Sequence, residues 1–431
     1  MKEETRIQKL KEIERGNHYG SGVKIPYRGE NKLFNTYQIP WEYLTYNKYN
    51  GRIRSLVKTF EKHNHELDPD SPEDIEKIEN FLMDSNKVRN KSTLENIVEF
   101  GQRVHGIVTA GGKIIDGNRR AMLLKSIYTD RRTKWKNHNV DDCKYFIAAI
   151  LPDNIADKEI RQLETIYQMG EDAKLDYNPI EKYLMIKELV EIEEFSIDDV
   201  AKWMGQNPGK VQEWKETMVL MDEYLDELGY QEIYTLLDKR EDLFLSLNKY
   251  IKRYENGRSQ YVDWGYEPED SEDLKLISFD YIRHQTDGKA FRDIAHANEG
   301  KNFFSQEKIW KEFSNKHFDA VDPISKDEEG VEEWRNNNSD VEDISEILKQ
   351  RDNEWSEKVK ENLDANFRKS KSKLIDIEDQ NKPAILIERA KDSLMSINDK
   401  TEHLYDKHLD ELLGIIIKRV NELRKIIKSG L

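Results

Sequence analysis

The sequence has a single cysteine and no long apolar run. Cys143 alone cannot form an intrachain disulfide bond or supply a cysteine-rich zinc site. The longest apolar runs, such as residues 145–151, are far shorter than the roughly 20 residues that a membrane-spanning helix needs. Residues 1–16 are rich in Lys, Glu and Arg and lack the apolar segment of a signal peptide. Together these absences predict a cytoplasmic protein with no membrane partner.

Positive charge is also in short supply. The 431 residues include 69 Lys and Arg against 85 Asp and Glu, which gives a formal net charge of −16. This balance opposes nucleic-acid binding over the whole surface and leaves room only for a local basic patch. Charged residues make up 36% of the chain and apolar types 37%, which indicates much solvated helical surface. At roughly 150 residues per domain, the length predicts about three domains.

Strand signals are concentrated before Pro152, and helical periodicity dominates after it. We therefore expect an α+β fold, in which a small mixed sheet is followed by a predominantly α-helical region. The first residues are polar with scattered glycines, which predicts a poorly packed arm with one short helix. The expected parts are this arm over residues 1–35, a sheet domain over 36–151, a helical domain with a helix-turn-helix over 152–240, a further helical domain over 241–330 and a charged helical region over 331–431.

The clearest local pattern is a hairpin that runs into a helix. Residues 104–109 alternate apolar and polar side chains, Gly111-Gly112 supplies a tight turn, and residues 113–116 return. Gly117-Asn118-Arg119-Arg120 then opens a helix. We call these four residues the glycine–arginine box.

The glycine–arginine box has the features of an anion site. The first turn of a helix presents free N–H groups and the positive end of the helix dipole, and guanidinium groups bind phosphate oxygens in pairs. Cations are unfavourable at this end of a helix, so an anionic ligand explains Arg119 and Arg120 better than helix stability does. A second interpretation stays open, in which one of the two arginines pairs with Asp116.

The strand, box and helix together resemble the signature of the ParB/sulfiredoxin-like superfamily, which includes chromosome and plasmid partition proteins. Three further stretches are similar to family segments in the same order: residues 44–52, residues 94–108 and residues 164–181. The resemblance covers residues 33–228, a little under half of the chain. The chain departs from the family by a long insertion after Arg52 and by the lack of a cysteine beside the box, which argues against sulfiredoxin activity.

The resemblance implies a bound nucleoside triphosphate, CTP or ATP, together with Mg²⁺. It makes Asp116 and Glu164 the candidate catalytic residues, which would position metal or water, and Glu164 the candidate metal ligand. Only one of Glu164 and Gln168 can be kept in register with the family's pattern. The expected nucleotide-binding residues are Arg52, Gly117, Asn118, Arg119, Arg120 and Gln168.

Residues 178–181 carry a second helix-start signal. Asn178 is expected to cap the helix and Pro179 to occupy its first position. Glu181, at the third position, is expected to close a capping box with Asn178.

A helix–glycine–helix pattern follows at residues 196–220. The partition family carries a helix-turn-helix at this place, and the pattern fits that motif. Eight acids against three lysines between residues 195 and 230 argue against tight DNA binding. The residues expected to face DNA are Gln206, Asn207, Lys210, Gln212 and Lys215.

Near the end of the sequence, six apolar residues recur with spacings of four, three, four, three and four. They are Leu409, Leu413, Ile416, Val420, Leu423 and Ile427. This is the spacing of a short coiled-coil seam. Because Ile415 and Ile417 broaden the apolar face, we expect the helix to dock on the same chain, with a homodimer as the alternative.

We therefore expect a ParB-like protein that binds a nucleoside triphosphate, with slow hydrolysis as an open question, in a DNA-linked process such as partition, mobile-element maintenance or phage defence. Three alternatives stay open. A nuclease would use Asp153 with Asp172 and Lys174, which have the spacing of a restriction-type metal site. A small-molecule kinase would have an activity that is known in the superfamily. A non-catalytic interaction protein would bind partners through its acidic helices.

Overall fold

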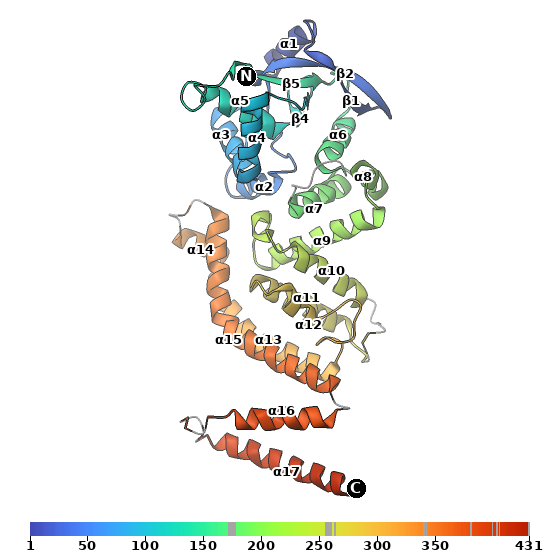
Figure 1. The fold of residues 1–431 in the computed structure, drawn as a ribbon, viewed down its shortest axis with the longest axis vertical. Coiled ribbons are helices and arrows are strands. Elements are labelled where there is room, and N and C mark those ends of the chain that lie inside the picture. Colours follow the sequence, from blue (N-terminus) through green and yellow to red (C-terminus); the bar gives the residue numbers. More distant parts are fainter. Residues whose placement is uncertain are drawn as a thin grey trace. The chain divides into compact units, whose positions relative to one another are not determined.

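The computed structural model describes residues 1–170, 178–254, 261–262, 264–338, 341, 343–379, 382–398, 400–401, 404 and 406–429. The chain divides into two compact units, Met1–Asn366 and Phe367–Leu431. The first unit contains a mixed β-sheet and most of the helices (Figure 1). The predicted boundaries after residues 151, 240 and 330 all lie inside this unit.

Five strands form one mixed sheet in the described residues, in the order β1-β2-β5-β3-β4. The strands are β1 (Gly20–Tyr27), β2 (Glu30–Pro40), β3 (Gly106–Val108), β4 (Ile114–Asp116) and β5 (Tyr145–Ile150). β5 pairs antiparallel with β2 and parallel with β3, while β1–β2 and β3–β4 are antiparallel hairpins. Because most of the remaining chain is helical, the expected α+β class is confirmed at this coarse level.

Residues 1–35 are not the poorly packed arm that we predicted. Helix α1 (Glu3–Glu14) is present, but β1 and the start of β2 form the outer hairpin of the sheet. The hairpin turns at Arg28 and Gly29, whose φ values are 51° and 82°. Strand β1 lies at the edge of the sheet, and in this hairpin Ile25 is buried while Leu33 is exposed. An edge hairpin that mixes apolar and charged residues in this way gives only a weak strand signal.

Helices connect the strands and make up the rest of the chain. Those around the sheet are α2 (Arg54–His63), α3 (Pro72–Asp84), α4 (Lys87–Phe100), α5 (Asn118–Thr129) and α6 (Asp157–Met169). Those that follow in the first unit are α7 (Pro179–Lys187), α8 (Ile197–Met204), α9 (Pro208–Glu227), α10 (Glu241–Tyr254), α11 (Pro268–Arg283), α12 (Gly288–Ile294), α13 (Glu307–Lys326) and α14 (Val331–Asn337). Then come α15 (Ile344–Glu378), α16 (Pro383–Met395) and α17 (Lys407–Ser429).

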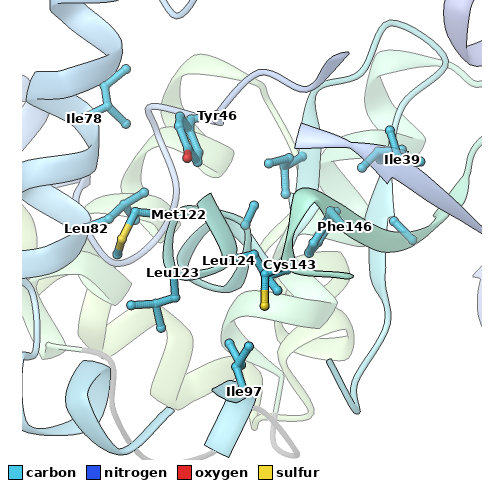
Figure 2. Close-up of a cluster of buried hydrophobic side chains, with 14 of the residues drawn as sticks. Ile39, Tyr46, Ile78, Leu82, Ile97, Met122, Leu123, Leu124, Cys143 and Phe146 are labelled. Carbon is cyan, nitrogen blue, oxygen red and sulfur yellow. The ribbon is translucent and has the colours of Figure 1, made fainter. Parts of the chain in front are cut away.

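Both faces of the sheet are covered, which explains why β5 is a continuous apolar run. On one face, Phe146 and Ile150 join a cluster of side chains from α2, α3, α4 and α5 (Figure 2). On the other face, Ile107 and Ala149 pack with Leu163 of α6. The start of α5 and helix α6 therefore both lie against the strands of this sheet.

The single cysteine belongs to this core. Cys143 is 4% exposed and lies in the cluster that Figure 2 shows. Burial, together with the nearby charge of Asp142, raises the pKa of its thiol to about 11. Such a thiol is a poor nucleophile at neutral pH, because the thiolate is the reactive form.

A cluster of buried charges fixes the start of α15 within the first unit. Asp352 accepts hydrogen bonds from the Tyr230 hydroxyl at 2.9 Å and from Arg283 Nε at 2.8 Å. Arg351 donates to the same Tyr230 hydroxyl at 2.9 Å and pairs with Glu328 at 3.1 Å. Asp352 and Arg283 are 1% and 2% exposed. Loss of Arg283 would therefore leave the buried carboxylate of Asp352 without its nearest counter-charge and out of reach of water.

The second unit leaves much apolar surface exposed. Ile416 and Val420 of α17 are 39% and 47% exposed, and Ile387 of α16 is 49% exposed. These exposures describe the second unit by itself, so the expected docking of the C-terminal seam on the rest of the chain stays a prediction. Within the same residues, no helix is long and apolar enough to cross a membrane.

Gly106 should not tolerate a side chain. A Cβ at this position would lie 2.2 Å from the ring of Phe146 and 2.9 Å from the carbonyl oxygen of Asp116. Gly106→Ala should force β3 or Phe146 to move, and lower the free energy of unfolding by about 1–3 kcal/mol. Thermal unfolding followed by circular dichroism measures this as a lower Tm. Gly265→Ala is the control, because nothing lies within 4 Å of a Cβ there, and an equal Tm for both variants would contradict the tight packing.

Candidate functional site

The glycine–arginine box stands where β4 ends and α5 begins. Gly117 has a φ of 109°, in the left-handed region that favours glycine. A Cβ there would also lie 2.6 Å from the ring of Phe146, so close packing against β5 requires glycine as well. Because Gly117 has no side chain to cap α5, the N–H groups of the first turn remain available to an anion or to water.

Arg120 is bonded within the protein. Its guanidinium donates to Asp116 Oδ2 at 2.6 Å and to the carbonyl oxygens of Val104 and His105. These bonds tie the start of α5 to the end of β4 and to the segment before β3. The pairing with Asp116, which the sequence left open, is therefore present for Arg120. Arg119 lies half-buried on the same turn.

The loop over residues 44–52 lies along the hairpin and touches the box. The carbonyl of Thr45 accepts a hydrogen bond from the N–H of Ile114 at 3.0 Å. Two residues later, the N–H of Asn47 donates to Asn118 Oδ1 at 3.0 Å. Asn118 is 2% exposed, and its Nδ2 is buried without a hydrogen-bond partner in the structure. An unsatisfied buried donor at a helix start is a feature that an anionic ligand would satisfy.

Helix α6 meets the same loop and hairpin. The side chain of Gln168 accepts from the N–H of Gly51 at 2.9 Å and donates to the carbonyl of Ile115 at 3.2 Å. One turn earlier, Glu164 accepts from Asn47 Nδ2 at 2.9 Å. Both Glu164 and Gln168 are 1% exposed. The structure thus brings together the two predicted residues of α6, the predicted loop and the box.

Two cations neutralise the carboxylate of Glu164. Lys113 Nζ lies 3.2 Å from one of its oxygens, and Arg161 lies 2.8 Å from the other. Burial opposes the charged form, but the two cations outweigh it and hold the pKa of Glu164 below its ordinary value. Sequence reasoning missed Lys113, since its place at the start of β4 gives no sign that α6 lies beside it.

The two predicted catalytic carboxylates do not form a metal site in this arrangement. Asp116 is paired with Arg120, and Glu164 is paired with Lys113 and Arg161. Among the described residues, no group of three or more His, Cys, Asp or Glu side chains is placed to hold a metal ion. The alternative nuclease spacing cannot be placed, because residues 172–174 lie outside the described residues.

Glu181 caps a different helix from the one predicted. Asn178 does cap α7, by accepting from the N–H of Ile180 at 3.0 Å. Glu181 instead accepts from the N–H and the hydroxyl of Ser55, in the first turn of α2, at 3.1 and 2.5 Å. Burial raises the pKa of Glu181, and the bonds from Ser55 only partly oppose this. The predicted capping box is wrong because the carboxylate of Glu181 accepts from Ser55, which is distant in sequence, and not from the start of its own helix.

Arg52, the remaining predicted nucleotide-binding residue, ends the same loop. It is half-buried, and its N–H donates to Asn50 Oδ1 at 3.2 Å. The next residues begin α2, so Arg52 stands between the loop that touches the box and the helix that Glu181 caps.

Four of the five residues expected to face DNA have partners in the helical region, three of them on α9 itself. Helices α8 and α9 are present as predicted, and Gly205 between them has a φ of 64°. Gln206 is half-buried, and the partners of the other four are the Gly209 N–H for Asn207, the Trp214 ring for Lys210, Glu216 for Gln212 and Glu191 for Lys215. These contacts account for their placement without DNA, and a DNA-binding role stays a prediction.

No model of a known protein family matches this chain, and no curated protein matches it either. The resemblance to the ParB/sulfiredoxin-like superfamily therefore depends on the motifs and on their arrangement in space.

Glu164 should stabilise the fold in a pH-dependent way. Its folded pKa is lowered, so its contribution is complete above the unfolded value and is lost as the pH falls through the folded value. Glu164→Gln leaves Lys113 without its counter-charge and Arg161 with Glu193 alone, which should cost about 2 kcal/mol of unfolding free energy at neutral pH. The difference in Tm from the unmodified protein should shrink as the pH falls below 4.5, the ordinary pKa of a glutamate side chain.

Glu181→Gln is the matched control for this measurement. The folded pKa of Glu181 is raised, so its ionised form is penalised and this variant should gain stability relative to the unmodified protein as the pH rises above about 4.5. Thermal unfolding of both variants across the same pH series gives the comparison. Parallel pH profiles would contradict the opposite electrostatic environments of the two carboxylates.

Proposed function

We propose that this chain is a ParB-like protein that binds a nucleoside triphosphate, CTP or ATP, at the glycine–arginine box. One observation carries the proposal. Segments with the family's pattern, separated by up to 117 residues, are joined by direct hydrogen bonds from Asn47 to Glu164 and from Gly51 to Gln168. Four independent chance matches would have no reason to meet around one helix start.

The chemistry of the box supports phosphate as the bound group. The first turn of α5 offers N–H groups and the positive end of the helix dipole. The buried Nδ2 of Asn118 adds a donor, and Arg119 adds a guanidinium on the same turn. Lys113, 42% exposed, supplies a further cation beside Glu164. In a chain of net charge −16, this concentration of donors and cations favours an anion.

Arg120 has a positioning role in this proposal. Because its guanidinium already bonds Asp116 and two backbone carbonyls, it fixes the turn that presents the N–H groups. Replacement of Arg120 would therefore disturb the hairpin as well as the ligand. Arg119 stands on the same turn but is not the residue that makes those hairpin bonds, which makes it the better position for a test.

Magnesium does not fit the carboxylate of Glu164 as it stands. Glu164 is enclosed by two cations and an amide, and both of its oxygens are engaged. Asp116 is paired with Arg120 through Oδ2. Any Mg²⁺ would be held mainly by the phosphates and by water, as this ion commonly is, with at most the other oxygen of Asp116. Hydrolysis therefore stays an expectation, and we assign no catalytic step to Asp116 or Glu164.

The site is coupled to the helices that follow it. Beyond the bond from Gly51 to Gln168, Ser55 of α2 bonds Glu181 of α7, and Lys62 of α2 pairs with Glu232 at 3.1 Å. A ligand that orders the loop would thus act on α2, α6 and α7 together. This coupling supports a role in which nucleotide binding controls the helical region, in a DNA-linked process such as partition, mobile-element maintenance or phage defence.

Arg119→Ala should weaken nucleotide binding by about 10- to 100-fold, because a charge-assisted bond to phosphate is lost. Isothermal titration calorimetry against ATP, CTP, GTP and UTP, each with Mg²⁺, gives the affinity and the preferred base. Arg119→Lys should recover part of the affinity. Arg132→Ala is the control, since Arg132 is an exposed arginine just after α5 and makes no ion pair within the described residues.

Three results would count against the proposal. If no nucleotide produces a heat of binding or raises the Tm of the protein, the chain is not a nucleotide-binding protein. That result would favour the alternative of a non-catalytic interaction protein. Cleavage of plasmid DNA by the same preparation would favour the nuclease. Transfer of labelled phosphate to free serine would favour the small-molecule kinase.

A further inference from the structure

The carboxylate of Glu164 stands where the family resemblance implies a metal ligand, and both of its oxygens are engaged. Asn47 Nδ2 donates to Oε1 at 2.9 Å, and Lys113 Nζ lies 3.2 Å from the same oxygen. Arg161 donates to Oε2 at 2.8 Å. Glu164 is 1% exposed, so bulk water does not reach it. A metal ion could therefore bind this carboxylate only by displacing one of its three donors.

Of the two cations on Glu164, Lys113 is the one that can also meet a ligand. Arg161 is held between two carboxylates, because it pairs with Glu193 at 2.9 Å as well. Lys113 makes no second ion pair within the residues that the structure describes, and 42% of its side chain is exposed. An ammonium group has three donor hydrogens. Those that do not point to Glu164 are available to an anion on the exposed side.

Asn47 connects this ammonium group to the glycine–arginine box. Its side chain donates to the Glu164 oxygen that Lys113 contacts, and its N–H donates to Asn118 Oδ1 at 3.0 Å. Asn118 is the first residue of α5. The cation and the helix start are therefore joined through a single residue of the loop, which places both beside one candidate ligand.

Asp116 offers a metal ion little more than Glu164 does. Its Oδ2 lies 2.6 Å from Arg120, which leaves at most the other oxygen. Mg²⁺ prefers an octahedral set of oxygen ligands and otherwise keeps its water. A metal ion at this site would consequently gain little from the protein, whereas a lysine gives a charge-assisted contact to phosphate with no metal to recruit.

We propose that Lys113 takes the place of the divalent metal ion at this site, and that the chain binds its nucleoside triphosphate without Mg²⁺. The inference rests on the proposed function, and it departs from what the family resemblance implies. Lys113 neutralises Glu164 in the free protein and, in the complex, shares its ammonium group between that carboxylate and a phosphate oxygen. Neither Asn47 nor Arg161 has to be displaced, so the loop keeps the position that it has in the free protein.

Calorimetric titration with CTP or ATP, whichever binds more tightly, tests metal independence when it is run once with Mg²⁺ and once with excess EDTA. The unmodified protein should show two affinities that agree within about threefold. Lys113→Met should lose about tenfold in EDTA, because a charge-assisted contact to phosphate is gone, and Lys113→Arg should recover part of this loss. Lys275→Met is the control, since Lys275 also pairs with glutamates but lies on α11.

The outcomes separate this inference from the proposed function. If the unmodified protein binds the nucleotide with Mg²⁺ but loses more than about tenfold of its affinity in EDTA, the inference is wrong and the proposed function stands. If the protein binds no nucleotide under either condition, the proposed function fails and this inference fails with it. Thermal unfolding checks that Lys113→Met is folded, and an unchanged affinity of the folded variant in EDTA would overturn the role of Lys113.

Manganese binding to the nucleotide-free protein tests the same carboxylate without any nucleotide. Electron paramagnetic resonance measures free Mn²⁺, which takes the same kinds of oxygen ligand as Mg²⁺. Lys113→Met should bind Mn²⁺ that the unmodified protein does not bind, and adding Glu164→Gln should abolish this gain. Equal Mn²⁺ binding by the unmodified protein and Lys113→Met would overturn the proposal. So would a loss of Mn²⁺ binding when Glu164→Gln is made alone.

Discussion

The carboxylate of Glu164 is the interaction on which the arrangement of the candidate site depends. Its oxygens accept from Asn47 in the loop and pair with Lys113 at the start of β4 and Arg161 on α6. A buried carboxylate with a single partner would be costly, but three donors from three segments offset the loss of water. The same contact that satisfies the charge therefore fixes where the loop lies, and the N–H of Asn47 in turn donates to the side chain of Asn118.

This dependence changes how the glycine–arginine box should be understood. Adjacent arginines at a helix start suggest two equivalent phosphate ligands. In the structure the two positions are unlike, because it is Arg120 that bonds Asp116 and the backbone before β3. Gly117 and Arg120 build a rigid turn, and the first turn of α5 then carries the donors that suit a ligand. In the function that we propose, the shape of the turn and the binding of the phosphate would thus depend on different neighbouring residues.

The sequence predicted those features that depend only on residues close together in the chain. The hairpin of β3 and β4, the helix that begins after Gly117, the start of α7 at Asn178 and the helices on either side of Gly205 all follow from a few adjacent residues. The outer hairpin of β1 and β2 did not, because an edge strand with one covered face has a weak pattern. The role of Glu181 was predicted wrongly, and the role of Lys113 was not predicted at all, for a different reason. Their partners, Ser55 and Glu164, are brought to them only by the packing of α2 and α6.

The positions of the acidic and basic residues in the structure explain part of the net charge of −16. Some of the acids are buried and serve as internal partners: Glu164 and Glu181 hold the loop and α2, and Asp352 holds α15. Other acids of the helical region contact Lys215 and Gln212 of α9, two of the residues expected to face DNA. Arg119 and Arg120 lie at the start of α5, and Lys113 lies just before β4. The phosphate ligand that we propose would need only these few cations, whereas a long polyanion would also meet acidic helices, so any DNA contact would be confined to a small part of the surface.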